Sequence, residues 1–396
     1  MQCGRPLLLR QPFAPDAFDQ VILGCVNVIA DEMNPARVAA LRLGMGERMT
    51  AFTVQINCGS GMQSIDTAYR YIQNGTADLI LAGGTESLSH APLVFSNRAV
   101  AWYGKLFAAR SIGAKLEAFL ALRPSLFAPV IGLERGLIDP ITDLNMGQTA
   151  ELVGHVFHVT RRQADEYAAE SQQRLATAQK NGWFADEVEP AFARDGTSFD
   201  HDDGVRPDST ADALAKLKPA FERPWGKVTP GNSSQITDGA SWVILASEEA
   251  VKEHKLTPKA VIVDSEWSAL DPSVMGLGPV YCSTAILQRH NLGLGDIELW
   301  ELNEAFAAQV LGCLAAWKDD EFCRDELGLP GAAGTISRDR LNVDGGAIGV
   351  GHPVGASGNR IVLHLVNAMK RLGYKRGIAT ECIGGGQGGA MLIETM

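Results

Sequence analysis

The sequence has few of the features that would place it outside the ordinary globular proteins. It contains no uninterrupted apolar run of about 18 residues, the length that a membrane-spanning helix needs. Its seven cysteines are scattered and form no CxxC pair, which argues against both a disulfide framework and a zinc site. We therefore expect reduced thiols, no metal and no transmembrane segment.

The chain also lacks an excess of positive charge and a secretory leader. Its 35 basic and 46 acidic residues give a net charge of −11, which argues against nucleic acid as the main partner. No charged segment followed by an apolar run opens the chain, so we expect no signal peptide and a cytoplasmic location.

What the sequence does contain is a long alternation of short apolar strands and amphipathic helices. With 396 residues, 46% of them hydrophobic, it is long enough for two or three domains of about 150 residues each. The predicted strands include Val21–Cys25, Leu79–Ala82, Trp242–Ala246, Val261–Val263 and Leu392–Glu394. The predicted helices include Ser60–Tyr71, Arg161–Lys180 and Arg360–Leu372. This alternation predicts an α/β fold with sheets covered on both faces.

A weak internal symmetry divides the chain. Residues 53–84 and residues 342–389 both read as a strand, a small-residue turn, a helix and a second strand. Two related α/β halves of this kind would bring their turns to a shared surface. We expect an N-terminal half from residues 1–87 and 237–257, an inserted loop domain from residues 88–236, and a C-terminal half from residues 258–396.

The first candidate for chemistry is Cys58, in the segment NCGSG. It follows an apolar strand and precedes a predicted helix, whose positive dipole end would lower the pKa of the thiol and raise the fraction of thiolate. The flanking glycines would let a substrate approach the backbone closely. The alternative is a buried cysteine that only fills space.

The second candidate is His352, in the segment GVGHPVGASG. Pro353 and the small residues around it would hold the imidazole in place and leave it accessible, which suits a general base with a pKa near neutrality. The alternative is a histidine that caps the helix that follows.

Two further candidates stand at the ends of apolar strands. Cys382 meets a run of glycines, whose N–H groups could point at one developing oxyanion, although a turn with a spare cysteine is the simpler interpretation. Asn303 and Glu304 follow another strand and could instead cap a helix that begins near Ala305. A nucleophilic thiol, an imidazole base, a second thiol and an amide together fit acyl transfer through a thioester on the enzyme.

The segments that hold these residues resemble the signature sequences of thiolases, the acyl-CoA:acetyl-CoA C-acyltransferases. They are INCGSGMQSI, NEAFAAQ, GGAIGVGHPVGASGNRI and ECIGGGQGGAMLIE, and they occur in the family's order. The resemblance implies two α/β halves in a layered α-β-α-β-α core, with an inserted loop domain that contributes the CoA and acyl pocket. The family normally opens with a strand that this sequence lacks, so we expect a truncated N-terminus and one strand fewer in the first half.

The resemblance implies a role for each candidate residue in thiolysis of 3-ketoacyl-CoA or in the reverse Claisen condensation. Cys58 would carry the acyl group and His352 would activate it. His352 and a water held by Asn303 would stabilise the enolate oxygen, and Cys382 would move the proton on and off the α-carbon. The N–H groups of Cys58 and Gly384 would form a second oxyanion hole. No cofactor would be bound covalently, since CoA is a substrate or product.

The resemblance also implies positions that bind the substrate. Ser234 and Gly231 would meet the pantetheine arm, Met146 would line it, Arg206 would lie near the adenine, and Phe306 would line the acyl pocket. The implied partners are acyl-CoA and CoA, in a homodimer or homotetramer. Short-chain biosynthetic thiolases usually have histidine where this sequence has Asn145, which weakens the expectation of a substrate limited to acetoacetyl-CoA.

The segment of residues 98–123 is unusual in charge and in pattern. It holds five basic residues and one acid, and apolar side chains recur every three or four positions from Trp102 to Phe119. It resembles the longer insert of β-subunits in fatty-acid oxidation complexes. It could contact a membrane surface or a hydratase/dehydrogenase partner, or it could form a lid packed over the acyl pocket.

Two other functions compete with the thiolase interpretation. A β-ketoacyl synthase-type condensing enzyme would have histidine or asparagine where Cys382 stands, and it usually works with an acyl carrier. An inactive CoA-binding module that keeps the fold would be expected to have lost Cys58 or His352, and both are present.

Overall fold

The computed structural model describes all 396 residues and contains two four-stranded sheets. The first sheet has the order β2-β1-β3-β8, in which β8 alone is antiparallel to its neighbour. Its strands are β1 (Gln20–Gly24), β2 (Thr50–Val54), β3 (Leu79–Ser87) and β8 (Asp238–Ala246). The helices of this half are α1 (Gly4–Leu9), α2 (Pro35–Arg42), α3 (Ser60–Gln73) and α10 (Glu248–Glu253).

The second sheet has the order β10-β11-β12-β9, with β10 and β11 parallel and the other pairs antiparallel. Its strands are β9 (Ala260–Ala269), β10 (Leu299–Leu302), β11 (Arg376–Ile383) and β12 (Gln387–Thr395). The helices of this half are α11 (Gly278–Arg289), α12 (Ala307–Ala316), α13 (Asp320–Asp325), α14 (Ala347–Val350) and α15 (Val354–Leu372). The strands β10 and β11 are almost wholly buried because helices cover both faces of this sheet.

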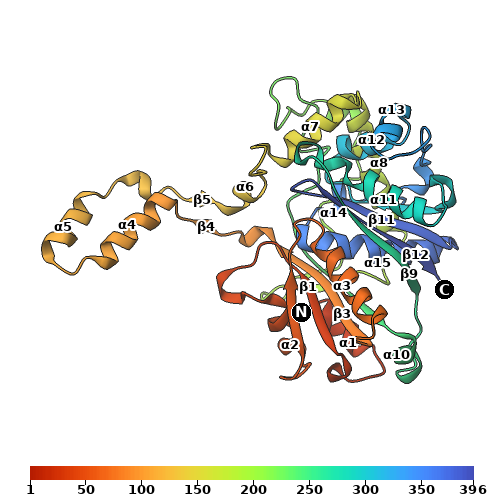
Figure 1. The fold of residues 1–396 in the computed structure, drawn as a ribbon, viewed down its shortest axis with the longest axis horizontal. Helices are drawn as coiled ribbons and strands as arrows, with labels where there is room; N and C mark the ends of the chain where they lie inside the picture. The colour runs from red at the N-terminus through yellow and green to blue at the C-terminus, as the bar shows by residue number, and fades with distance from the viewer.

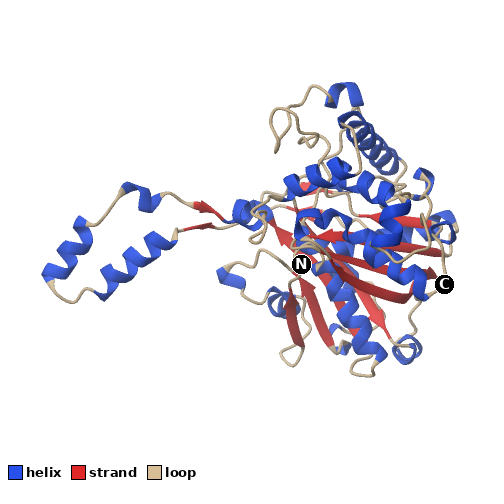
Figure 2. Cartoon of the chain, turned by 45° about the horizontal axis from the view of Figure 1, so that its top comes forward, coloured by secondary structure: helices blue, strands red, loops and turns tan.

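Helices α3 and α15 pack against each other between the two sheets. Helix α3 packs on β1 and β3, and α15 packs on β10 and β11 while also touching β3 and β8. Helix α2 covers the outer face of the first sheet, and α11 covers the outer face of the second. Figure 2 shows the strands in red and the covering helices in blue. The layered α-β-α-β-α arrangement with two related halves is therefore confirmed.

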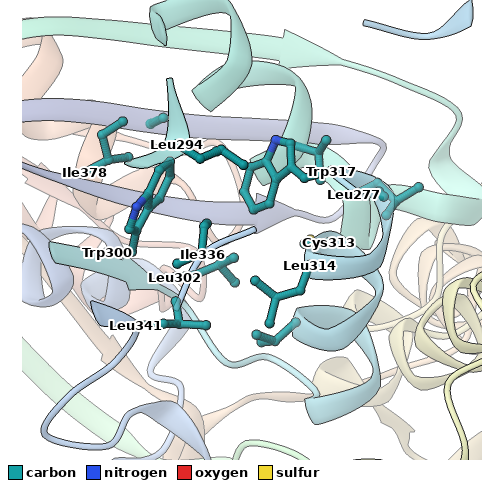
Figure 3. Packing of buried hydrophobic residues seen from close by; sticks show 14 of the residues in the cluster. Leu277, Leu294, Trp300, Leu302, Cys313, Leu314, Trp317, Ile336, Leu341 and Ile378 are labelled. Carbon is teal, nitrogen blue, oxygen red and sulfur yellow. The ribbon is translucent and has the colours of Figure 1, made fainter. Parts of the chain in front are cut away.

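The hydrophobic core is divided between the outer and the central layers. A cluster of 25 buried residues lies within the C-terminal half and its covering helices, and it includes Trp300 and Trp317, whose ring centroids are 5.6 Å apart (Figure 3). A second cluster of 16 residues takes Ile22 from β1, Met62 from α3 and Ile361 from α15. The two halves thus share one core along the seam between α3 and α15.

The region between β3 and β8 has two parts with different surroundings. The second part packs on α12 of the C-terminal half and contains α7 (Met146–Val156), α8 (Arg161–Lys180), the short strands β6 (Ala191–Phe192) and β7 (Ser198–Phe199), and α9 (Ala211–Leu214). Helix α8 begins at a capping box made by Thr160 and Gln163, as the sequence predicts, and has the predicted bounds.

The first part of this region is a long arm, residues 91–138, that stands away from the rest of the molecule (Figure 1). Its elements are β4 (Leu93–Val94), α4 (Asn97–Ala108), α5 (Ile112–Leu120), β5 (Val130–Ile131) and α6 (Gly132–Gly136). Helices α4 and α5 pack on each other, and the indole N–H of Trp102 donates to the carbonyl of Ala118 at 2.8 Å. The prediction of a lid packed over the acyl pocket is wrong, because the hairpin of α4 and α5 projects outward.

Other predictions differ from the structure in detail. Helix α15 begins at Val354, six residues before the predicted start. The strand predicted to begin at Asn342 is not formed. The only β-type pairing there is an isolated bridge between Leu341 and Trp300. No helix is both long enough and apolar enough to cross a membrane.

Candidate active site

Cys58 lies in a tight connection between β2 and α3. Asn57 adopts a left-handed conformation with φ +47°, and Ser60 closes the turn by accepting the Ile56 N–H at 2.9 Å and donating to the Asn57 carbonyl at 2.6 Å. Gly59 packs closely on the other half, since a Cβ at this position would stand 2.5 Å from Cδ1 of Ile383. The Cys58 loop is therefore pressed directly against the end of β11.

Cys382 and Gly384 belong to the facing turn of the C-terminal half. Cys382 is buried near the end of β11, and Gly384, Gly385 and Gly386 connect it to β12. Gly386 has φ +79°, and a Cβ there would stand 2.2 Å from the carbonyl oxygen of Leu270. Only glycine fits such a left-handed and crowded position.

A direct contact joins the two turns. The side-chain amide of Asn57 donates to the carbonyl of Gly384 at 2.7 Å. The backbone of Gly384 in turn lowers the pKa of the Cys58 thiol, which favours its thiolate form. Each half thus supplies part of one hydrogen-bonded site.

His352 is buried beside Asn303 and Ser357. Ser357 donates to the Pro353 carbonyl at 3.2 Å, so its oxygen accepts from Nδ1 of His352 at 2.6 Å. This assignment leaves Nε2 as the basic nitrogen, which lies 3.5 Å from Nδ2 of Asn303. The alternative that His352 caps α15 is wrong, because Pro353 is the N-cap residue and no side chain caps that end.

Glycines on α3 and α15 bring the Cys58 and His352 loops together. Gly61, three residues after Cys58, packs so closely that a Cβ would stand 3.0 Å from the carbonyl oxygen of Gly355 and 2.7 Å from the N of Asn359. Gly355 itself comes three residues after His352. Residues almost 300 positions apart therefore meet where the two central helices begin.

Burial sets the protonation states of the site. It raises the pKa of Cys58 to about 12, although the Gly384 N–H opposes the shift. It lowers the pKa of His352 to about 4, aided by the positive charge of Arg360. Two predictions are therefore wrong, the lowered pKa of the Cys58 thiol and the near-neutral pKa of His352, because desolvation outweighs the helix dipole. At neutral pH the resting pair is an uncharged thiol and a free imidazole base.

The second thiol is held still more firmly in its protonated form. Burial raises the pKa of Cys382 well above its usual range, and negative charge on Cys58 or Cys313 would raise it further. Burial also raises the pKa of the neighbouring Glu381, whose carboxyl oxygens have no hydrogen-bond partner. Cys382 is therefore protonated at rest and is able to act first as an acid.

Glu304 fixes the strand end that carries Asn303. Its carboxylate accepts from four groups, the Tyr167 hydroxyl at 2.9 Å, the Ser171 hydroxyl at 2.7 Å, the Asn342 amide at 3.1 Å and the Ile348 N–H at 3.2 Å. The alternative that Asn303 and Glu304 cap a helix is wrong, because α12 begins at Ala307 after Phe306. No group of three or more His, Cys, Asp or Glu residues is arranged to hold a metal ion.

The family models of two domains cover nearly the whole chain. Residues 2–249 match the thiolase N-terminal domain, and residues 256–395 match the thiolase C-terminal domain. The chain belongs to the thiolase family. The beta-ketoadipyl-CoA thiolase of Pseudomonas aeruginosa is 40% identical over 383 residues, which are 96% of this chain and 88% of that protein.

Other relatives agree in sequence and in structure. The acetyl-CoA acetyltransferase of Allochromatium vinosum is 36% identical over 394 residues, which are 98% of this chain and 91% of that protein. The crystal structure of human mitochondrial 3-ketoacyl-CoA thiolase in complex with CoA is 36% identical and superimposes with a TM-score of 0.84, covering 100% of this chain and 90% of that chain. Like these relatives, this thiolase is an acyltransferase.

The residues expected to bind CoA and the acyl chain are placed at different distances from the thiols. Met146 and Phe306 pack with Cys382, and a Cβ at Gly384 would stand 3.2 Å from Sδ of Met146. The Ser234 N–H donates to the carbonyl of Ala305 at 3.0 Å, beside Phe306. These three residues are gathered at the site.

Gly231 and Arg206 lie further out. Gly231 packs against Leu214 and Leu217, where a Cβ would stand 2.6 Å from each side chain. Arg206 is exposed at the surface, and its backbone N–H donates to the side chain of Gln172 on α8 at 2.8 Å. Their roles toward CoA stay predictions.

The sequence interpretation missed several residues that shape the site of this thiolase. Asn57 and Ser357 are among them, since the sequence shows them only as neighbours of Cys58 and His352. Glu86 was not singled out, yet its buried carboxylate accepts from the N–H groups of Val26, Asn27 and Gly355 at 2.9–3.1 Å and so ties the two halves together. Polar side chains near strand ends are the available signal for Asn57 and Glu86, but their partners are more than 50 positions away.

We expect Asn57→Gly to lower kcat about 10–100-fold while KM for CoA changes less than about twofold. Glycine keeps the left-handed backbone of residue 57 but removes the amide that holds Gly384, and a single misplaced oxyanion donor costs up to about 10²–10³-fold. Steady-state thiolysis kinetics would measure both constants. Asn291→Gly is the matched control, since Asn291 also has a positive φ of +52° but follows α11. An unchanged kcat in Asn57→Gly would show that the contact does not position the turn.

Proposed function

We propose that the enzyme cleaves 3-ketoacyl-CoA with CoA through an acyl group carried on Cys58. The thiol proton passes to Nε2 of His352 as the sulfur attacks the 3-keto carbon. The bond between C2 and C3 then breaks, and acetyl-CoA leaves as its enolate. The raised pKa of Cys382 supports its action as the acid that protonates the α-carbon of this enolate.

The second half-reaction returns the enzyme to its resting state. The Cys382 thiolate takes the proton of an incoming CoA thiol, and the CoA sulfur attacks the acyl group on Cys58. The bond between the acyl carbon and the Cys58 sulfur then breaks, acyl-CoA leaves, and the proton on Nε2 of His352 returns to Cys58. The N–H groups of Cys58 and Gly384 stabilise the oxyanion formed in each attack on the acyl carbon. His352 and a water on Asn303 stabilise the enolate oxygen. The reverse sequence is a Claisen condensation of two acyl-CoA molecules.

The observation that carries this proposal is the meeting of the two turns, where Asn57 donates to the Gly384 carbonyl at 2.7 Å and a Cβ at Gly59 would stand 2.5 Å from Cδ1 of Ile383. A condensing enzyme of the β-ketoacyl synthase type is not favoured, since Cys382 stands where that class has histidine or asparagine. The inactive module is also not favoured, because a CoA-binding role alone would not need two thiols and an imidazole base where the two halves meet.

We propose that the acyl group is an uncharged chain longer than acetoacetyl. The wall beside Cys382 is apolar and is made by Met146, Met275 and Phe306, with Phe221 in edge-on contact with Phe306 at 6.2 Å between ring centroids. The Oδ1 atom of Asn145 accepts from the Gln148 N–H at 2.9 Å in a capping box on α7, which engages the amide oxygen of this side chain. A terminal carboxylate on the acyl chain would lose its hydration against this wall without gaining a partner.

We expect kcat/KM to be at least about tenfold higher for 3-ketohexanoyl-CoA than for 3-ketoadipyl-CoA, which has the same chain length and a terminal carboxylate, because the charge is left unpaired. Loss of the magnesium–enolate absorbance of the 3-ketoacyl-CoA would follow thiolysis of both substrates, with acetoacetyl-CoA as the short reference. A preference for 3-ketoadipyl-CoA would refute the uncharged acyl chain while leaving the thiolase reaction in place.

The remaining features of the proposed function concern organisation. We propose that the chain divides into an N-terminal half of residues 1–87 and 237–257, a loop domain of residues 88–236 and a C-terminal half of residues 258–396. We also propose a homodimer or homotetramer, in which a partner subunit would cover the unpaired edge strand β2. We place the enzyme in the cytoplasm, in fatty-acid β-oxidation. A partner from a fatty-acid oxidation complex would find its most extensive unpartnered surface on the arm.

A further inference from the structure

A buried cluster of charged side chains lies along α15, and the proposed reaction does not use it. At its centre is His364, whose Nδ1 lies 2.7 Å from Oε1 of Glu187, on the segment that follows α8. Its Nε2 lies 3.4 Å from Oδ2 of Asp344 and 3.8 Å from Oε1 of Glu301, on β10. Because carboxylates face both ring nitrogens, each nitrogen carries a proton and His364 is an imidazolium.

The protonation states of the cluster agree with this geometry. Burial alone would lower the pKa of His364, but the charges of Glu187 and Glu301 hold it well above its ordinary value. Burial would also raise the pKa of Glu187 and of Asp344, yet the imidazolium keeps both below their ordinary values. The other charged side chains that face the cluster are Arg360 and Arg371 of α15. Loss of the imidazolium would leave buried carboxylates without their shared partner.

Two of these carboxylates belong to the segments that carry the site. Glu301 and Asn303 are two positions apart along β10 and the residue that extends it, so their side chains share the face of the strand that meets α15. Asn303 faces Nε2 of His352 at 3.5 Å, and Asp344 lies on the connection that leads to His352. Helix α15 and its N-terminal loop are therefore joined to β10 at two levels, by His364 with Glu301 and by His352 with Asn303.

We propose that His364 is a positioning residue that holds α15 in register with β10 and so sets the separation of Asn303 and His352. The inference rests on the proposed function, in which these two residues stabilise the enolate oxygen. A displacement of about 1 Å at a reacting centre can cost about 10²-fold in rate. The pairing of His352 with Cys58 depends instead on the close packing of the two central helices at Gly61, which the cluster does not touch.

The test compares two rates in the full-length His364→Gln variant. Acetylation of Cys58 by acetyl-CoA, followed by intact-protein mass, should change less than about threefold, because it forms no enolate. Cleavage of acetoacetyl-CoA should fall about 10–100-fold, with KM for CoA changed less than about twofold. Asp344→Asn should separate the two rates in the same way if His364→Gln does not fold. His290→Gln is the matched control, since Nε2 of His290, at the end of α11, lies 2.8 Å from Asp264 and far from the cluster.

The dependence of Tm on pH provides a second measurement. Because the pKa of His364 in the folded protein is raised above the unfolded value of 6.5, its contribution to stability is fully present below pH 6.5 and is lost as the pH rises through the folded pKa. The Tm of His364→Gln should therefore lie below that of the native enzyme in weak acid and approach it in alkaline solution. Equal loss of acetylation and cleavage, or a lower Tm with both rates unchanged, would overturn the positioning role. A native enzyme that forms no acetyl adduct would instead refute the proposed function.

Discussion

Replacing Cys58 with alanine should abolish formation of the acyl-enzyme and lower the thiolysis rate by at least about 10⁴-fold. Cys382 cannot take its place, because Cys382 is fully buried and holds its proton, whereas Cys58 is partly exposed in the connection between β2 and α3. Intact-protein mass spectrometry after incubation with acetyl-CoA would detect the acetyl adduct on the native enzyme and its absence from the variant.

The matched control for this experiment is Cys3→Ala. Cys3 is the other cysteine of the chain that is not fully buried, and it lies next to α1, away from the seam between the halves. This variant should acquire the acetyl group and turn over at the native rate. An adduct that persists in Cys58→Ala would assign the nucleophile to another residue. A native enzyme that folds, binds CoA and forms no adduct would instead favour the inactive module.

Replacing Cys382 with alanine should leave acylation of Cys58 intact and lower cleavage and condensation about 10²–10⁴-fold. The first attack on acetyl-CoA needs only Cys58, His352 and the oxyanion donors, whereas making or breaking the carbon–carbon bond needs a proton moved at the α-carbon. The acetyl adduct by mass and the rate of acetoacetyl-CoA thiolysis would separate the two steps in one preparation.

Cys313→Ala is the control for the second thiol. Cys313 is a buried cysteine on α12 whose pKa is also raised by burial, and its negative charge would raise the pKa of Cys382. It donates to the Gly276 carbonyl at 3.1 Å and should affect turnover only a few-fold. Equal loss of acylation and cleavage in Cys382→Ala would show that this residue acts in the first attack rather than at the α-carbon.

Local sequence patterns predicted the repeating elements well. The capping box of Thr160 and Gln163 predicts α8 with its observed bounds, and short apolar runs predict β1, β3 and β8. The residues of β1 and β3 are almost all buried because helices cover both faces of the first sheet. Patterns failed where an element depends on distant contacts. The sequence that begins at Asn342 predicts a strand, but the structure has only an isolated bridge there, between Leu341 and Trp300. Helix α15 starts earlier than its apolar periodicity indicates.

The sequence by itself determined which residue types are available for the chemistry and the alternation that makes two α/β halves, since these depend on side chains and on spacing along the chain. Only the tertiary structure decided the protonation states of Cys58 and His352, the bond from Asn57 to Gly384, and the outward course of the arm. Desolvation and hydrogen bonding depend on which atoms from remote segments surround a group, and no local pattern of residues records that.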